Sequence, residues 1–192
     1  MDSGNIGFVL LCAAFVFVMT PGLAMFYGGL VRKKNVVNTM MTSIFIIGIG
    51  IVMWVLFGYS LSFAPSGNAF IGDFRWLGLE GVSLTEGYTD DASIPNMVFS
   101  AFQMMFAVIT PALITGAVAG RMKFKSIFVF TIFWSLIVYY PLAHMVWGQG
   151  GLLGADGIGA LDFAGGDVVH ISSGVSALVP VSYTHLTLPT KL

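Results

Sequence analysis

The feature that most constrains the fold is a set of long stretches that contain no Asp, Glu, Lys or Arg. These stretches cover residues 3–31, 35–72, 92–120 and 126–155. Each is longer than the roughly 20 residues that a helix needs to cross a bilayer. We therefore expect membrane spans at about 6–30, 39–63, 94–119 and 126–147, and a shorter fifth span at about 163–179.

Composition supports an all-α polytopic membrane protein. Of the 192 residues, 57% are hydrophobic and only 9% are charged, whereas a typical soluble domain is about 25% charged. The net charge of −1 argues against nucleic-acid binding, which needs a basic face. Cys12 is the only cysteine, so no disulfide can form within the chain. No nucleophile–base pair or metal-ligand spacing is recognisable, and we predict neither an enzyme nor a cofactor.

The basic residues predict the orientation. One basic group, residues 32–34, follows the first span, and a second, residues 121–125, separates the third and fourth spans. The connection at 64–93 is acidic, with Arg75 as its only basic residue. Short loops rich in Lys and Arg stay cytoplasmic. We therefore expect the N-terminus and the 64–93 loop to lie outside.

Aromatic residues near the outer ends of two spans suggest a cation site. Phe102 and Phe106 are four residues apart and share one helical face, and His144 and Trp147, three apart, share another. Gln103 is a further polar exception in the same apolar stretch. Aromatic faces gathered in a vestibule can attract a small cation. The alternative is the aromatic belt that lies at any membrane interface.

The segment DFAGGDVVHISSG, residues 162–174, places ionisable groups in an apolar context. Asp162 precedes Gly165-Gly166, so its carboxylate can cap the following helix, or it can contact a substrate. Asp167 falls in the first turn, where the helix dipole stabilises an acid. His170 lies deeper in the predicted span, and a histidine there normally faces a pathway or a cofactor.

Proline and small residues indicate close packing between spans. Pro21 and Pro111 are expected to bend the first and third spans. Gly116 and Gly120 form a GxxxG step that would let a partner helix approach.

Four segments resemble one family closely. They are TPGLAMFYGGLVRKKNVVNTMM, FQMMFAVITPALITGAVAGRMKF, PLAHMVWGQGGLL and GALDFAGGDVVHISSGVSAL. They resemble the ammonium transporter family, the Amt branch of the Amt/Mep/Rh proteins, over residues 5–178. The resemblance implies about eleven transmembrane helices in two inverted five-helix repeats, assembled as homotrimers in the plasma membrane. This chain would supply the N-terminal half, the first repeat.

The resemblance also implies roles for individual residues. Phe102 and Trp147 match the aromatics that recruit ammonium, and Phe106 matches a gate phenylalanine. Asp162 matches a supporting acid, and His170 matches the first of two pore histidines. The implied function is transmembrane transport of ammonium or ammonia, with methylammonium as an analogue: cation–π recruitment, deprotonation and passage through a hydrophobic, histidine-lined pore. A PII-type regulator is an implied partner, and no cofactor is implied.

The sequence also departs from the family. The second repeat is missing, so we expect the chain to be inactive alone. Residues 180–192, PVSYTHLTLPTKL, match nothing in the family and are predicted to be a non-native tail, so His185 receives no role. The alternatives are an ammonium sensor lacking its cytoplasmic signalling domain, a Rh-type gas channel, or a haem-binding redox protein with His144 and His170 as axial ligands.

Overall fold

The computed structural model describes residues 1–65, 67–155 and 157–187, and side chains as far as residue 182. Every regular element in this part of the chain is helical, which confirms the all-α class. The longer helices are α1 (Ser3–Leu30), α2 (Val36–Met53), α4 (Asn96–Val118), α5 (Phe124–Trp134) and α7 (Ser172–Thr187). The shorter ones are η1 (Lys33–Asn35), α3 (Tyr59–Phe63), η3 (Leu77–Leu79) and α6 (Tyr140–Trp147), with the π-helical turns η2 (Trp54–Gly58), η4 (Ser135–Tyr139) and η5 (Gly166–Ile171).

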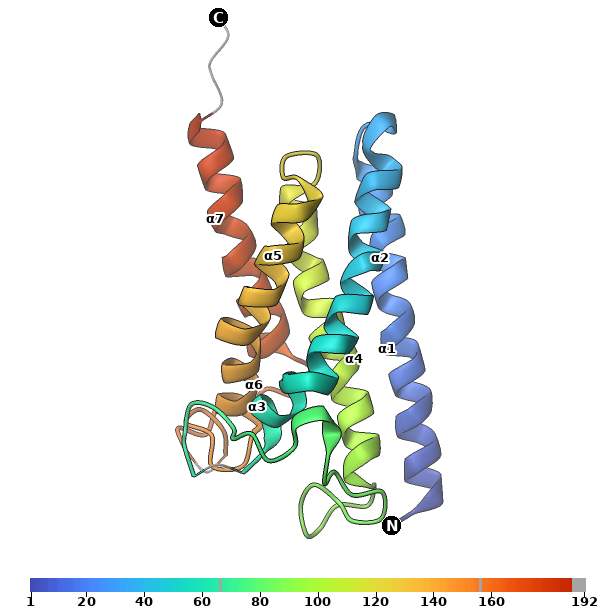
Figure 1. The fold of residues 1–192 in the computed structure, drawn as a ribbon, viewed down its shortest axis with the longest axis vertical. Helices are drawn as coiled ribbons and strands as arrows, with labels where there is room; N and C mark the ends of the chain where they lie inside the picture. The colour runs from blue at the N-terminus through green and yellow to red at the C-terminus, as the bar shows by residue number, and fades with distance from the viewer. Residues whose placement is uncertain (66, 156, 188–192) are drawn as a thin grey trace, which may run out of the picture.

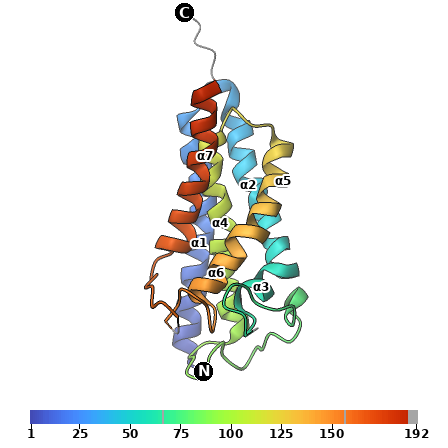
Figure 2. The ribbon, with the colours of Figure 1, turned by 90° about the vertical axis from the view of Figure 1, so that its left-hand side faces the viewer.

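The long helices form an elongated bundle (Figures 1 and 2). Helix α4 lies inside it and packs against α1, α2 and α7, while α3 packs against α6. Four helical stretches are long and apolar enough to cross a membrane: Ser3–Leu30, Lys33–Phe63, Asn96–Val118 and Phe124–Trp147. The chain is therefore a multi-pass membrane protein.

The last helix is longer than the fifth predicted span. Together, η5 and α7 continue without interruption from Gly166 to Thr187 and contain Pro180, whereas the sequence predicts an end near 179. Residues 188–192 of the predicted tail lie outside the described residues, as does the side chain of His185.

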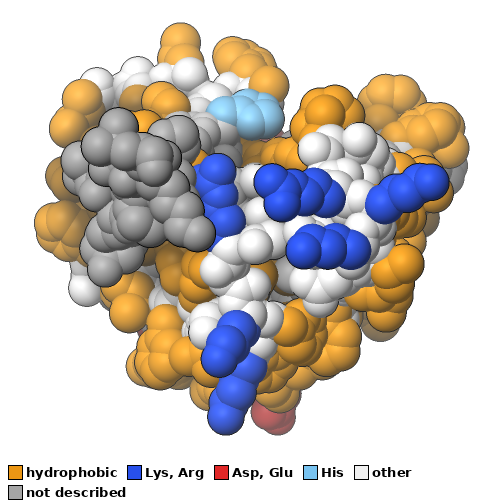
Figure 3. All heavy atoms as spheres, turned by 90° about the horizontal axis from the view of Figure 1, so that it is seen from above, with side chains coloured by type: hydrophobic (Ala, Val, Ile, Leu, Met, Phe, Trp, Pro, Cys, Tyr) orange, Lys and Arg blue, Asp and Glu red, His pale blue; other side chains and the backbone are white. Residues whose placement is uncertain are grey.

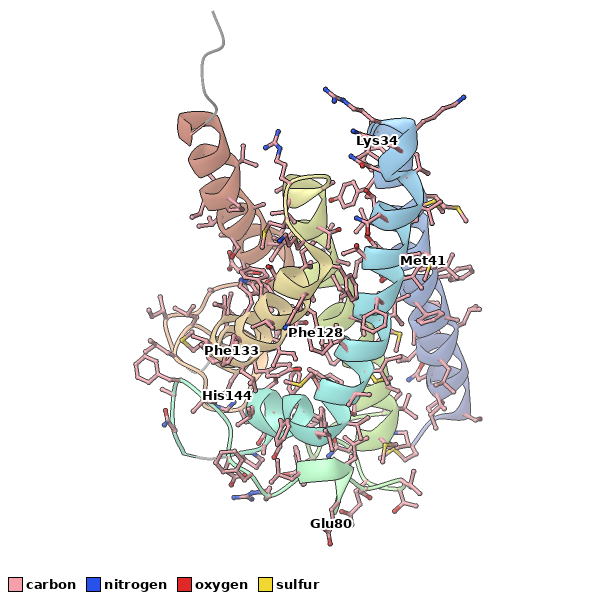
Figure 4. The ribbon with its side chains drawn as sticks, turned by 45° about the horizontal axis from the view of Figure 1, so that its top comes forward. Lys34, Met41, Glu80, Phe128, Phe133 and His144 are labelled. Carbon is pink, nitrogen blue, oxygen red and sulfur yellow. The ribbon has the colours of Figure 1, made fainter. Side chains whose placement is uncertain are left out.

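Charges separate along the bundle axis. The N-terminus and the long connections 64–95 and 148–165 lie at one end, which we call the acidic end (Figure 1). The other end carries the turns with the two basic groups, and Figure 3 shows their Lys and Arg side chains gathered on that face. We call it the basic end. Lys34 and Glu80 mark the two ends in Figure 4.

The π-helical turns allow close packing at the acidic half. Gly58 ends η2, and a Cβ there would lie 2.7 Å from the ring of Tyr140. Because glycine leaves that space empty, the two rings Tyr140 and Trp54 can pack against each other, with centroids 6.0 Å apart. These residues belong to a buried aromatic core that also includes Tyr59 and Phe63.

The predicted GxxxG step does not form. Helix α4 ends at Val118, and Gly120 lies in the following turn with φ of +70°. Gly116 is a close-packing site, but for a side chain: a Cβ there would lie 2.6 Å from the ring of Tyr27. The Tyr27 hydroxyl donates a hydrogen bond to the carbonyl of Leu113, at 2.9 Å. The helices α1 and α4 continue past Pro21 and Pro111.

Candidate functional site

A cleft of about 500 Å³ opens at the acidic end. Its walls come from α4, the end of α6, the segment before η5 and the loop that precedes α4. The lining residues without a predicted role are Tyr88, Thr89, Ala92, Ile94, Phe99, Gln103, Phe163, Ala164 and Gly165. The structure brings Phe102, Phe106, Trp147 and Asp162 together around this cleft.

Helix α4 supplies an aromatic stripe. Phe99, Phe102 and Phe106 recur at helical spacing and all line the cleft. The rings of Phe102 and Phe106 have centroids 5.1 Å apart at an interplanar angle of 84°, an edge-to-face pair. One ring face of such a pair can remain open to a ligand. Phe99 was not among the predicted site residues, although its helical spacing from Phe102 and Phe106 is a signal that could have found it.

Trp147 is fixed by the segment that crosses beside it. It is the last residue of α6, and its indole Nε1 donates to the carbonyl oxygen of Asp162, at 3.1 Å. This bond satisfies the only polar atom of the indole, so the ring keeps one orientation against the cleft. The contact joins residues 15 positions apart in the chain.

The Asp162 carboxylate caps the last helix. Its Oδ1 accepts from Gly166 N at 2.6 Å, and its Oδ2 accepts from Asp167 N at 3.0 Å and Val168 N at 3.1 Å. Three N–H groups that a helix start leaves unpaired are thereby satisfied. Gly165 makes the turn possible, because its φ is +77° and a Cβ there would lie 2.8 Å from Val169 Cγ2.

Tyr88 closes the cleft from the loop side. Its ring stacks on Phe99, with centroids 4.9 Å apart and an interplanar angle of 6°. Gln149 N donates to the Tyr88 hydroxyl at 3.0 Å, and Gln149 Nε2 donates to the Tyr88 carbonyl at 2.9 Å. Burial raises the pKa of Tyr88 from its ordinary value near 10 to about 12, so the folded protein favours the neutral phenol. No sequence pattern pointed to Tyr88, because a loop position has no periodicity.

His144, labelled in Figure 4, is a buried anchor on α6 and not a ligand. Its side chain is 0% exposed, with Nδ1 3.1 Å from the carbonyl oxygen of Ser62 and Nε2 2.8 Å from that of Asn68. Both ring nitrogens face backbone carbonyls in a fully buried site, so neither is open to an iron ion. The haem hypothesis is therefore wrong for His144. In the part of the chain that the structure describes, no group of three or more His, Cys, Asp or Glu is placed to hold a metal ion.

His170 does not join the aromatic group. It lies in η5, its side chain is exposed, and it is not among the residues that line the cleft. The next turns expose Ile171 and Val175, which are 58% and 60% exposed. His170 thus lies on an uncovered lateral face of this chain, closer to the basic end than the cleft-lining segment 162–165.

Comparison with known proteins identifies the family. The model described as Ammonium Transporter Family matches residues 7–186. The chain belongs to the ammonium transporter family. It is 53% identical over 179 residues to an ammonium transporter of Bacillus subtilis, covering 93% of this chain and 43% of that protein. This member of the family therefore spans less than half the length of that relative. The match extends into residues 180–186, part of the predicted tail.

Solved structures show the same fold. The crystal structure of Saccharomyces cerevisiae Mep2 superposes with a TM-score of 0.84 at 36% identity, covering 98% of this chain and 40% of Mep2. A structure titled Sensor Amt Protein gives a TM-score of 0.76 at 28% identity, over 91% of this chain and 42% of the other.

Proposed function

We propose that this chain forms the outer recruitment site and one wall of the conduction path of an ammonium transporter in the plasma membrane. One observation carries the proposal: Phe102, Phe106 and Trp147 surround a single cleft that no Lys or Arg lines. Aromatic faces attract a small cation that has shed some of its water. A site without competing positive charge, at an end rich in carboxylates, favours ammonium over neutral solutes.

The next step is separation of the charge. A bare cation in hydrocarbon is strongly disfavoured, whereas a neutral molecule enters at far lower cost. Phe106 lies seven residues beyond Phe99 on α4, about 10 Å further along the helix axis. Its ring would separate the hydrated cleft from the conduction path deeper in the bundle, toward the basic end. Ammonium would lose a proton near this point, and ammonia would pass the ring.

His170 would serve the path beyond the gate. A neutral imidazole donates from one ring nitrogen and accepts at the other, so it can carry a polar molecule through an apolar lumen. Its exposure in this chain leaves room for a partner wall. We propose that the remaining part of the full-length protein supplies that wall and the second histidine. Asp162 would keep the mouth in shape through its cap, and the chain without its second half would be inactive.

The recruitment step is tested by Trp147→Leu in the full-length protein, with uptake of labelled methylammonium as the measurement. Loss of the indole face is expected to raise the half-saturating concentration about tenfold, since a desolvated cation–π contact can contribute about 1–2 kcal/mol. The matched control is Phe133→Leu, because Phe133 is 58% exposed on α5 and does not line the cleft. Equal uptake by wild type and Trp147→Leu would mean that Trp147 does not recruit the cation and is part of the aromatic belt at the membrane interface.

The pore step is tested separately by His170→Leu. We expect methylammonium uptake to be abolished or its selectivity changed, while binding at the cleft persists. Unchanged transport would remove His170 from the path.

A sensor remains the second candidate, because a solved structure titled Sensor Amt Protein shares the fold. The higher identity to the Bacillus subtilis ammonium transporter, 53% against 28%, favours transport. Membrane vesicles that contain the full-length protein separate the two, since a sensor would bind methylammonium without accumulating it. The homotrimer and a PII-type regulator, which would contact parts largely outside this chain, are further parts of this proposal.

A further inference from the structure

The two glutamines of the chain have opposite environments at the same end of the bundle. Gln149 is exposed, and its amide nitrogen donates to the Tyr88 carbonyl at 2.9 Å. Gln103 lines the cleft, and its Oε1 is buried without a hydrogen-bond partner in the described part of the chain. A buried carbonyl oxygen without a donor is rare and costs free energy. Gln103 therefore needs an explanation that Gln149 does not.

The cleft contains few other groups that could accept an N–H. The faces of Phe102 and Trp147 attract positive charge but have no lone pairs directed at a donor. The Asp162 carboxylate already accepts from three backbone N–H groups. The Tyr88 hydroxyl accepts from Gln149 N. Among the cleft-lining side chains that the structure describes, Gln103 offers a buried oxygen that no protein donor uses.

The position of Gln103 on α4 suits contact with a bound cation. It precedes Phe106 by three residues, so its side chain emerges one helical turn from Phe106, at the edge of the aromatic stripe, and it lines the same cleft. An ion against these rings can reach Oε1 without leaving the aromatic faces.

We propose that Gln103 Oε1 accepts a hydrogen bond from an N–H of the cation held in the cleft. The bond makes Gln103 a specificity-determining residue: it favours cations that carry N–H groups, such as ammonium and methylammonium, over cations without N–H, such as tetramethylammonium. This inference rests on the proposed recruitment function, because it requires the cation to occupy the cleft.

The experiment compares Gln103→Met with wild type in the full-length protein, purified in detergent. Methionine keeps the length of the side chain but removes the amide. Ammonium and tetramethylammonium are titrated separately, and their dissociation constants are measured by isothermal titration calorimetry, which does not depend on a tryptophan in the cleft. We expect ammonium binding to weaken about tenfold, the change expected when a charged donor loses one hydrogen bond. Tetramethylammonium binding should stay unchanged, because it depends on the aromatic faces alone.

Two further variants make the comparison sharper. Gln149→Met removes the amide that already has a partner, and it should leave the ratio of the two dissociation constants at the wild-type value. Gln103→Glu restores an acceptor at the same reach, and it should recover ammonium binding if Gln103→Met loses it.

Three outcomes would overturn the inference. If Gln103→Met leaves both constants unchanged, Oε1 does not contact the cation. If both constants rise together, the substitution has reshaped the cleft and the hydrogen bond is not the cause. If wild-type protein binds neither cation, the recruitment function itself fails, and the inference fails with it. Loss of both cations in Trp147→Leu, with no change in Gln103→Met, would preserve recruitment and reject Gln103.

Discussion

The acidic and basic ends of the bundle are closed by different kinds of structure. At the basic end, adjacent helices are joined by short turns, residues 31–35 and 119–123. At the acidic end, the connections run over 64–95 and 148–165, and they fold back over the helix ends. The cleft, the aromatic core beside it and the hydrogen bonds of His144, Trp147 and Asp162 all lie there.

The difference in connection length explains why the candidate site forms at only one end of the bundle. A short turn fixes only the two helices that it joins, whereas a long loop can bring distant residues against a helix end. At the acidic end, backbone carbonyls of Ser62 and Asn68 meet His144, and that of Asp162 meets Trp147. Each contact joins parts of the chain that no local turn connects. We expect substitutions to have large effects where these contacts are buried and small effects elsewhere.

The largest expected effect is that of His144→Leu. The imidazole donates to the carbonyl of Ser62 or of Asn68, according to its tautomer, and leucine removes that bond from a region where His144 is 0% exposed. The free energy of unfolding should fall by about 2–4 kcal/mol. Thermal unfolding in detergent measures the loss, and proteolysis of the 64–72 segment shows where it occurs.

The control for this substitution lies at the basic end. Lys123→Leu removes an exposed side chain before α5, and it should change the stability by less than about 0.5 kcal/mol. Equal losses from the two variants would mean that the acidic end is no more tightly organised than the basic end.

Asp162→Ala should have the next largest effect. The carboxylate caps three backbone N–H groups, and its removal should cost about 1–2 kcal/mol of stability. Methylammonium uptake by the full-length protein should also fall, because loss of the cap frees the segment whose backbone carbonyl, that of Asp162, holds the Trp147 indole. Asp167→Ala is the matched control, since the Asp167 carboxylate makes no hydrogen bond in the described part of the chain. Similar losses for the two variants would argue against the cap.

Local patterns predicted some of this site and missed the rest for physical reasons. Phe102 and Phe106 share a face because helical spacing determines it. The position of Asp162 before two glycines is typical of a cap, which the three N–H bonds now provide. The partners of His144 and the docking of Tyr88 depend on loops that fold back from elsewhere. Sequence gives no periodic signal for such contacts, and the GxxxG prediction failed because α4 stops at Val118.

Tyr88→Phe tests the loop over the cleft, with an expected loss of about 0.5–1 kcal/mol at neutral pH. The substitution removes the hydroxyl that accepts from Gln149 N but keeps the ring that stacks on Phe99. The pH dependence gives a second readout. Because burial raises the pKa of Tyr88 to about 12, the folded state favours the neutral phenol. This contribution to stability is complete below the ordinary pKa near 10 and is lost as the pH rises toward 12.

Unfolding measured between pH 9 and 12 should therefore show a steeper decline for wild type than for Tyr88→Phe. The other tyrosines are the same in both proteins, so the difference between the two curves reports on Tyr88. Parallel curves would mean that this phenol is hydrated and that the loop does not seal the cleft.

The smallest expected effect is that of Arg75→Ala, although it breaks an ion pair at the acidic end. Arg75 Nη2 lies 2.7 Å from Asp73 Oδ2, but the two side chains are 53% and 32% exposed. An exposed pair of this kind contributes at most about 1 kcal/mol and often nothing measurable. The hydrogen bond from Arg75 holds the pKa of the Asp73 carboxyl below its usual range. Its contribution is thus present at neutral pH and is lost as the pH falls through the lowered pKa.

The contribution of the Arg75–Asp73 pair is measured from the free energy of unfolding at pH 7 and pH 3, each at low and high salt. When the pH falls from 7 to 3, or the salt concentration rises, the free energy of unfolding of wild type should fall by a few tenths of a kcal/mol more than that of Arg75→Ala. If breaking the ion pair in Arg75→Ala lowered the free energy of unfolding nearly as much as His144→Leu does, buried contacts would not be what organises the acidic end. Such a result would mean that the charges of the acidic end hold its loops in place. The structure indicates the reverse, because His144, the side chain that ties the 62–68 segment to α6, is fully buried and bonded to carbonyls.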